Sequence, residues 1–287
     1  MSSSEPRPPA RTGASRLAVR GDELAVWDRP GDGLPVVFLH GNGCSTEAFR
    51  GLFESGVLAR HRLVAFDLPG CGRSRDARTA ATTYGLAGLA DVAIDTIAAL
   101  GVTRYVLVGW SLGGHVAIEM LLHGAKPQGL VLTGTPPCGP DPAEIAATFL
   151  PAPGAEFMST EHPSAELCAA FVKTVYAPAT PSEALSRDAA RADGRLRKYF
   201  FEYVFANPHL EPQRVTVANW PGPIALVQGT RECLFDPKAL DALSWGNLWR
   251  GGTQWIAGAG HAPHVSHPEE YARVLKAFAD DLAAAGR

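Results

Sequence analysis

The sequence predicts an α/β fold built on a mostly parallel, eight-stranded sheet with helices on both faces. Two observations support this prediction. Short apolar runs alternate with helical patterns along most of the chain, and glycine-rich loops follow several of these runs. Alternating strands and helices form right-handed crossovers, which make the strands parallel and place helices over the sheet. Because ligands bind at the carboxyl ends of such strands, the loops there are expected to form one site.

The predicted elements follow in order from residue 15. A hairpin around Gly21 and Asp22 begins the sheet with antiparallel strands at 15–20 and 23–28. Buried strands are predicted where apolar residues run between turn residues, at 34–39, 62–66, 105–108, 128–133, 223–228 and 253–256. Helices are predicted where apolar residues recur at helical spacing, at about 46–53, at 86–100, from the turn at Ser111 to about 123, from 238 onward and at 268–284.

The alternation lapses between residues 137 and 221, over a stretch too long for a simple crossover. Proline-rich links there separate helical patterns at 143–149, 164–175 and 182–205. We interpret residues 138–211 as a helical cap inserted into a core formed by 15–137 and 212–287, with 1–14 as a disordered tail. Aromatic side chains between 199 and 205 are expected to hold the cap on the core. Tyr203 is assigned to the substrate pocket.

Composition limits the classes of function. With 287 residues, a net charge of −3 and a pI near 6.3, the chain has no electrostatic footprint for nucleic acid, and it has no basic amphipathic helix for a membrane surface. The first fourteen residues contain no apolar segment typical of a signal peptide or anchor. Five cysteines without C-x-x-C spacing predict reduced thiols in the cytoplasm and no metal site. Arginine outnumbers lysine, which favours a bacterial source.

A serine between small residues is the main candidate nucleophile. Ser111 follows an apolar strand and precedes a helix, so its hydroxyl is expected at the tip of a sharp turn. Glycines at 109 and 113 permit that turn, because a Cβ there would crowd the neighbouring backbone. The Gly-x-Ser-x-Gly pattern is weak by itself, since a chain so rich in glycine often contains it by chance.

Other loops supply what a serine nucleophile needs. A hydroxyl becomes reactive when an imidazole accepts its proton and a carboxylate orients that imidazole. Glu232 follows a later strand, and His261 lies in the loop after the last strand. Asp236 is the alternative acid, although it is better explained as the cap of the helix that begins at Pro237.

This order of serine, acid and histidine resembles the α/β-hydrolase fold from about residue 15 to 284. Four segments carry the resemblance: His40-Gly41-Asn42-Gly43, Asp67-Leu68-Pro69-Gly70-Cys71-Gly72-Arg73-Ser74, Gly109-Trp110-Ser111-Leu112-Gly113-Gly114 and Gly260-His261. The family more often has aspartate as the acid, and Glu232 is an accepted variant.

The resemblance also implies the roles of other residues. Backbone N–H groups of Asn42 and Leu112 are expected to bind the oxyanion. Trp110 is expected to shape the acyl side of the pocket, which we also expect to include Gly41. His264 is expected to be structural or to line this pocket.

We therefore expect a cofactor-independent serine hydrolase that cleaves an ester, thioester or lactone of a small, mostly apolar molecule through an acyl-enzyme. Relatives that open epoxides or remove halide use aspartate where this chain has Ser111. A C–C bond hydrolase or a cofactor-free perhydrolase with the same triad is the nearest alternative. An acyltransferase and a non-catalytic ligand receptor remain open, as does a homodimer.

Overall fold

A computed structural model describes residues 15–285, and the predicted tail at 1–14 lies outside the described residues. Eight strands form one sheet: β1 (Ser15–Val19), β2 (Asp22–Arg29), β3 (Gly33–Leu39), β4 (His61–Phe66), β5 (Val106–Trp110), β6 (Gly129–Thr133), β7 (Ile224–Gly229) and β8 (Gln254–Ile256). Their spatial order is β1-β2-β4-β3-β5-β6-β7-β8. The pairs β1–β2 and β2–β4 are antiparallel, and the pairs from β4 to β8 are parallel. The predicted fold class is confirmed.

The strand order reverses at the centre of the sheet. The chain leaves β3 for β4 on one side and returns to β5 on the other, so β3 and β5 are neighbours. Loops that follow two such strands diverge and leave a crevice between them at the carboxyl edge. The loop after β3 and the turn at Ser111 therefore flank one crevice.

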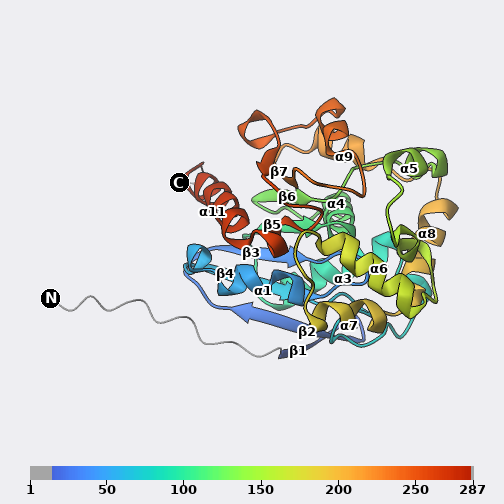
Figure 1. Ribbon diagram of the computed structural model, residues 1–287. Coiled ribbons are helices and arrows are strands. Elements are labelled where there is room, and N and C mark those ends of the chain that lie inside the picture. Colours follow the sequence, from blue (N-terminus) through green and yellow to red (C-terminus); the bar gives the residue numbers. More distant parts are fainter. Residues whose placement is uncertain (1–14, 286–287) are drawn as a thin grey trace.

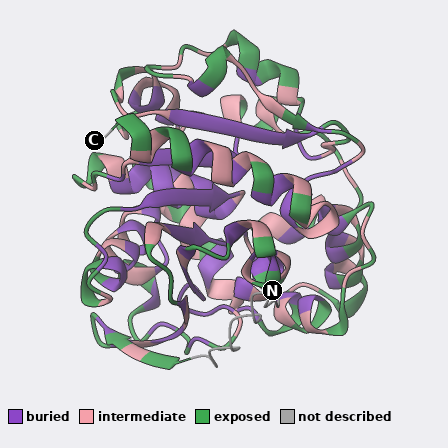
Figure 2. Ribbon diagram, turned by 90° about the vertical axis from the view of Figure 1, so that its left-hand side faces the viewer, coloured by how far each residue is buried: buried purple, intermediate pink, exposed green. Residues whose placement is uncertain are grey.

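Helices cover both faces of the sheet (Figure 1). Strand residues alternate between two apolar clusters, one with Val37 and Leu39 and the other with Val36 and Phe38. On the first face, the sheet packs against α3 (Leu86–Ala99) and α4 (Leu112–Leu122), and on the second against α1 (Arg50–Glu54) and α11 (Pro268–Ala285). Figure 2 shows the result, with strands buried and the outer surfaces of helices exposed.

The segment between β6 and β7 is helical. It contains α5 (Pro142–Thr148), η3 (Ala155–Ser159), α6 (Ala165–Tyr176), α7 (Glu183–Arg191), α8 (Gly194–Ala206) and, just before β7, α9 (Gln213–Asn219). The helical pattern predicted at 182–205 is thus two helices and not one. Ala192 is extended, and the Asp193 side chain accepts a hydrogen bond from the backbone N–H of Arg195 to begin α8. We call residues 138–211 the cap segment.

Polar contacts tie the cap segment to the loop after β4. The Asp193 carboxylate accepts a hydrogen bond from the Tyr84 hydroxyl at 2.7 Å, and its backbone N–H donates to the Gly70 carbonyl at 2.8 Å. The Arg191 guanidinium donates to the carbonyls of Gly70 and Ser74. These contacts fix the link between α7 and α8 against the core.

Short elements complete the described chain. They are η1 (Thr46–Phe49), η2 (Gly56–Leu58), α2 (Ala80–Thr83), η4 (Pro237–Ala242), η5 (Trp249–Gly251) and α10 (Pro263–Ser266). Within residues 15–285, no helix has both the length and the apolar character needed to cross a bilayer.

Candidate active site

Ser111 occupies a strained turn between β5 and α4. Its backbone has φ 54° and ψ −122°, a left-handed conformation that costs free energy for any residue with a Cβ. The Ser111 N–H donates to the Thr133 carbonyl at 2.9 Å and holds the turn against β6. A Cβ at position 113 would lie 2.2 Å from the Leu39 carbonyl oxygen, so only glycine fits beside β3. The turn therefore depends on the glycine that follows it.

His261 and Glu232 form a buried hydrogen-bonded pair. His261 Nδ1 lies 2.8 Å from Glu232 Oε2, and the two side chains are 2% and 1% exposed. Glu232 Oε1 accepts hydrogen bonds from the backbone N–H groups of Cys233 and Leu234, each at 2.8 Å. Burial alone would raise the pKa of Glu232. The opposing effect of His261 and of these N–H donors is larger in sum, so the pKa lies below its ordinary value. Glu232 is therefore a charged acceptor at neutral pH.

Asp236, the alternative acid, has a different position. Its Oδ1 accepts a hydrogen bond from the Lys238 backbone N–H at 3.0 Å and caps η4. The carboxylate that the structure brings to His261 is that of Glu232. Glu232 and Asp236 differ in the donors that hold them. The backbone N–H groups of Cys233 and Leu234 bind one oxygen of Glu232 and leave the other facing His261.

Gly134 and Trp110 position His261 near the serine turn. Gly134 directly follows Thr133, which holds the Ser111 backbone, and a Cβ at Gly134 would lie 2.6 Å from Cε1 of His261. Trp110 Nε1 donates to the His261 carbonyl at 3.0 Å. The sequence pattern gave neither residue this role, because both contacts join segments far apart in the chain.

Two backbone N–H groups beside Ser111 that were predicted to bind the oxyanion have no acceptor within the described residues. They belong to Leu112, the first residue of α4, and to Asn42 in the loop after β3. A helix begins with N–H groups that its own carbonyls cannot satisfy, and these bind anions well. The Asn42 side chain is used elsewhere, because its Nδ2 donates to the Met158 carbonyl at 3.0 Å.

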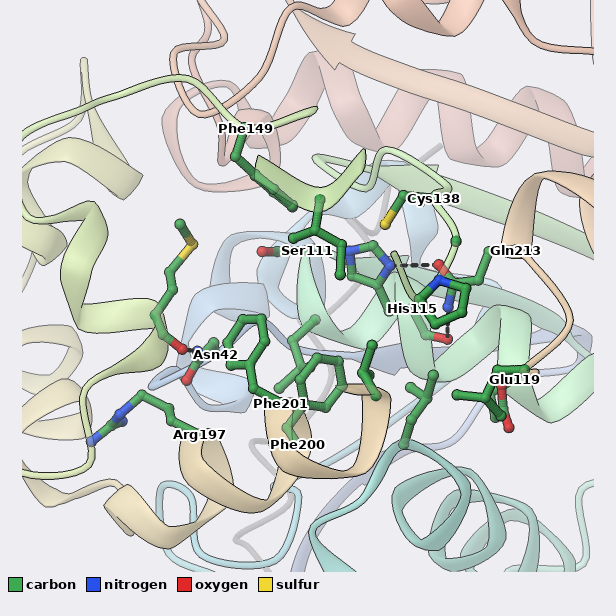
Figure 3. A pocket seen from close by; sticks show the side chains of 18 of the residues that line it. Asn42, Ser111, His115, Glu119, Cys138, Phe149, Arg197, Phe200, Phe201 and Gln213 are labelled. Carbon is green, nitrogen blue, oxygen red and sulfur yellow. Dashed lines mark hydrogen bonds between the residues drawn. The ribbon is translucent and has the colours of Figure 1, made fainter. Parts of the chain in front are cut away.

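A mostly apolar cavity lies between the turn and the cap segment (Figure 3). Ser111 and Leu112 form its floor, and α8 forms one wall through Phe200, Phe201 and Val204. The space between its walls, open solvent included, is about 900 Å³. The remaining lining residues are Asn42, Leu86, His115, Glu119, Cys138, Gly139, Pro140, Ile145, Phe149, Met158, Leu196, Arg197, Leu210, Glu211 and Gln213.

The four residues assigned to the pocket from sequence do not line this cavity. Tyr203 lies on the face of α8 that packs against Gly85 at the start of α3. Trp110 is 1% exposed beneath the site, and His264 is fully buried between Trp110 and Phe49. Gly41 packs closely against Ser111 and Trp110, and forms the back of the turn.

Sequence reasoning placed Ser111 and Asn42 in the site but missed other polar residues of the cavity. His115 follows Ser111 by one helical turn, which is the spacing that could have identified it. Cys138 is the first residue of the cap segment and Gln213 lies just after its end, and the Gln213 N–H donates to the Cys138 carbonyl at 2.9 Å. Among the described residues, no group of three or more His, Cys, Asp or Glu side chains could hold a metal ion.

The model of the alpha/beta hydrolase family matches residues 36–274. Pimeloyl-[acyl-carrier protein] methyl ester esterase from Photorhabdus laumondii is 30% identical over 269 residues, covering 88% of this chain and 94% of that protein. The enzyme of the same name from Edwardsiella ictaluri is 31% identical over 264 residues, covering 85% and 93%.

Solved structures of N-acyl homoserine lactonase AidH are also similar. One is a serine-to-glycine variant in complex with N-hexanoyl homoserine lactone, with a TM-score of 0.89, 32% identity and coverage of 94% of this chain and 98% of that chain. A glutamate-to-glycine variant in complex with N-hexanoyl homoserine has the same TM-score and identity, and covers 94% and 97%. This protein belongs to the alpha/beta hydrolase family.

Proposed function

We propose that this protein is a serine hydrolase that cleaves carboxylic esters, including lactones, through an acyl-enzyme on Ser111. The observation that carries the proposal is the buried Glu232–His261 pair beside a strained serine turn. A carboxylate that accepts from His261 Nδ1 fixes the tautomer in which Nε2 can accept a proton. Ser111, His261 and Glu232 are then nucleophile, base and orienting acid.

The reaction uses only residues of the chain. His261 Nε2 takes the Ser111 hydroxyl proton while the serine oxygen attacks the ester carbon. The N–H groups of Leu112 and Asn42 bind the oxyanion that develops, and each such donor contributes ~3 kcal/mol to the transition state. His261 then protonates the leaving alkoxide, and a water activated by the same imidazole releases the carboxylic acid. In a lactone, the leaving hydroxyl stays attached to the acyl group.

A neutral, acyl-bearing substrate suits the cavity. Its walls are mainly apolar, and the guanidinium of Arg197 is directed away from Ser111 (Figure 3). That guanidinium donates to the Thr160 carbonyl at 2.6 Å and lies over the Phe157 ring, so it is not an anion site. An N-acyl homoserine lactone with a short acyl chain is the first candidate, because AidH matches nearly the whole chain. The second candidate substrate is a methyl ester on a longer acyl chain, because the similar esterases are named for cleavage of such an ester.

The test is hydrolysis of a panel by the wild type and Ser111→Ala. The panel contains N-butanoyl and N-hexanoyl homoserine lactone, a monomethyl dicarboxylate ester and p-nitrophenyl esters. We expect wild-type turnover of at least one class and a loss of at least about 10³-fold in Ser111→Ala. Turnover that persists in Ser111→Ala would overturn the proposal. Vinylogous diketones and alcohol acceptors in the same assay test for C–C hydrolysis and acyl transfer.

We further propose a cytoplasmic location. All five cysteines are free, which suits a reducing compartment.

A further inference from the structure

The imidazole of His115 is a polar group in the cavity that the proposed reaction does not use. His115 follows Ser111 by four residues on α4, which places it about 6 Å along the helix. It is half-buried and lines the cavity with Ser111. Figure 3 shows its ring between Ser111 and Gln213, with one nitrogen hydrogen-bonded to Gln213 and the other on the side of Ser111.

Gln213 fixes which nitrogen of His115 carries the proton. Gln213 Nε2 donates to the His115 backbone carbonyl at 3.1 Å, and a carbonyl can only accept. The other end of the amide, Oε1, therefore faces His115 Nδ1 at 2.6 Å. Because this oxygen also can only accept, Nδ1 must donate and carries the proton.

The second nitrogen of His115 is then a bare acceptor. Burial lowers the pKa of His115, so the ring is neutral, and Nε2 keeps an unshared electron pair. Nε2 has no hydrogen-bond partner within residues 15–285, and it lies in a cavity whose lining as a whole is mostly apolar. An acceptor in such a place favours a ligand that carries a hydrogen-bond donor. A purely apolar ligand would displace water from the acceptor and leave it without a hydrogen bond, which costs free energy.

We infer that His115 Nε2 accepts a hydrogen bond from an N–H group next to the ester carbonyl of the substrate. This inference rests on the proposed function and narrows it to esters or lactones of N-acylated amino acids. An N–H on the α-carbon of such a substrate is separated from the carbon bonded to Ser111 by a single atom, and His115 lies one helical turn from Ser111 in the wall of the same cavity. His115 is thereby a specificity-determining residue, and proton transfer is left to His261.

The experiment compares two lactones that differ only in this donor. One is N-hexanoyl homoserine lactone, and the other replaces its amide N–H by CH2. We expect wild type to favour the N–H lactone by roughly tenfold in kcat/KM. His115→Phe removes the acceptor, and the ratio of the two kcat/KM values is expected to fall to about one. Gln213→Leu removes the oxygen that holds the proton on His115 Nδ1, so the proton can also occupy Nε2. This variant is expected to lower the ratio as well.

His123→Phe is the matched control. This histidine lies at the end of the same helix and does not line the cavity: its Nδ1 pairs with Asp91 at 2.6 Å, and its Nε2 lies 3.4 Å from Glu119, a carboxylate of the lining. It should leave the ratio at the wild-type value. The ratio is an internal measurement, so a partly unfolded variant lowers both rates and leaves the ratio unchanged.

The outcomes separate the two proposals. A wild-type ratio near one, or a ratio that survives in His115→Phe, would overturn the role of His115 while ester hydrolysis by Ser111 stands. If wild type hydrolyses neither lactone but cleaves p-nitrophenyl esters, the amino acid class is likewise wrong. Loss of all Ser111-dependent turnover would overturn the proposed function and this inference together.

Discussion

At the scale of single residues, the site depends on which nitrogen carries a proton. Glu232 receives two backbone N–H groups on Oε1 and His261 on Oε2, so each carboxylate oxygen has a defined donor. Gln213 likewise fixes the tautomer of His115, because its amide oxygen accepts from Nδ1 while its NH2 group donates to the His115 carbonyl. Both imidazoles thus carry a proton on Nδ1, but only His261 faces a carboxylate, whose negative charge can stabilise an imidazolium.

Replacement of Glu232 by glutamine tests this arrangement. The amide oxygen must face the N–H groups of Cys233 and Leu234, so the amide NH2 would face His261 Nδ1 and drive the proton to Nε2. Glu232→Gln is expected to lower kcat by roughly 10³- to 10⁴-fold, measured on the best ester of the panel. Asp236→Asn, which changes only a helix cap, should stay close to wild type. Equal losses in the two variants would contradict the assignment of the acid.

His264 makes stability depend on pH. Both of its ring nitrogens lack partners within the described residues, and burial lowers its pKa from 6.5 to about 3. The unfolded chain therefore binds a proton below pH 6.5 that the folded chain does not, and acid destabilises the fold. His264→Leu removes this penalty. From about pH 7.5 to 5.5, the free energy of unfolding of the variant should gain about 1.4 kcal/mol relative to wild type. Urea titrations of both proteins at the two pH values measure this change. A difference in free energy of unfolding that does not vary with pH would contradict the prediction.

At the scale of elements, close backbone packing sets the serine turn. α4 begins so near β3 that position 113 has no room for a side chain. Gly113→Ala is expected to lower the free energy of unfolding by about 3 kcal/mol or more, because the clash is with backbone. Gly56→Ala is the matched control, since nothing lies within 4 Å of its added Cβ. Urea denaturation of both variants checks this, and equal stabilities would contradict it.

Sequence patterns predicted the strands and the order of Ser111, Glu232 and His261, because turns, apolar runs and loop residues are local signals. The cavity wall was not predictable in the same way. The break at Ala192 sets the rotation of α8, which turns Phe201 to the cavity and Tyr203 to α3. His264 and Trp110 are polar enough to suggest a site, yet tertiary packing buries both. Such outcomes depend on contacts between distant segments.

At the scale of the whole molecule, loops from separate strands meet at one edge of the sheet. The reversal of strand order brings the loop after β3 beside the turn after β5, and the pair from the loops after β7 and β8 completes the site. The cap segment closes the cavity above it and is tied to the loop after β4. The loops of the core thus carry the proposed triad, and α4 with the cap segment lines the cavity above it.

Covalent labelling tests the central claim most directly. The protein is treated with a fluorophosphonate, digested, and analysed by peptide mass spectrometry, with Ser111→Ala as the control. We predict a single phosphonyl adduct on Ser111 of the wild type, slower labelling of Glu232→Gln and none in Ser111→Ala. An adduct on another residue, or ester hydrolysis by a wild-type protein that takes no label, would contradict the account.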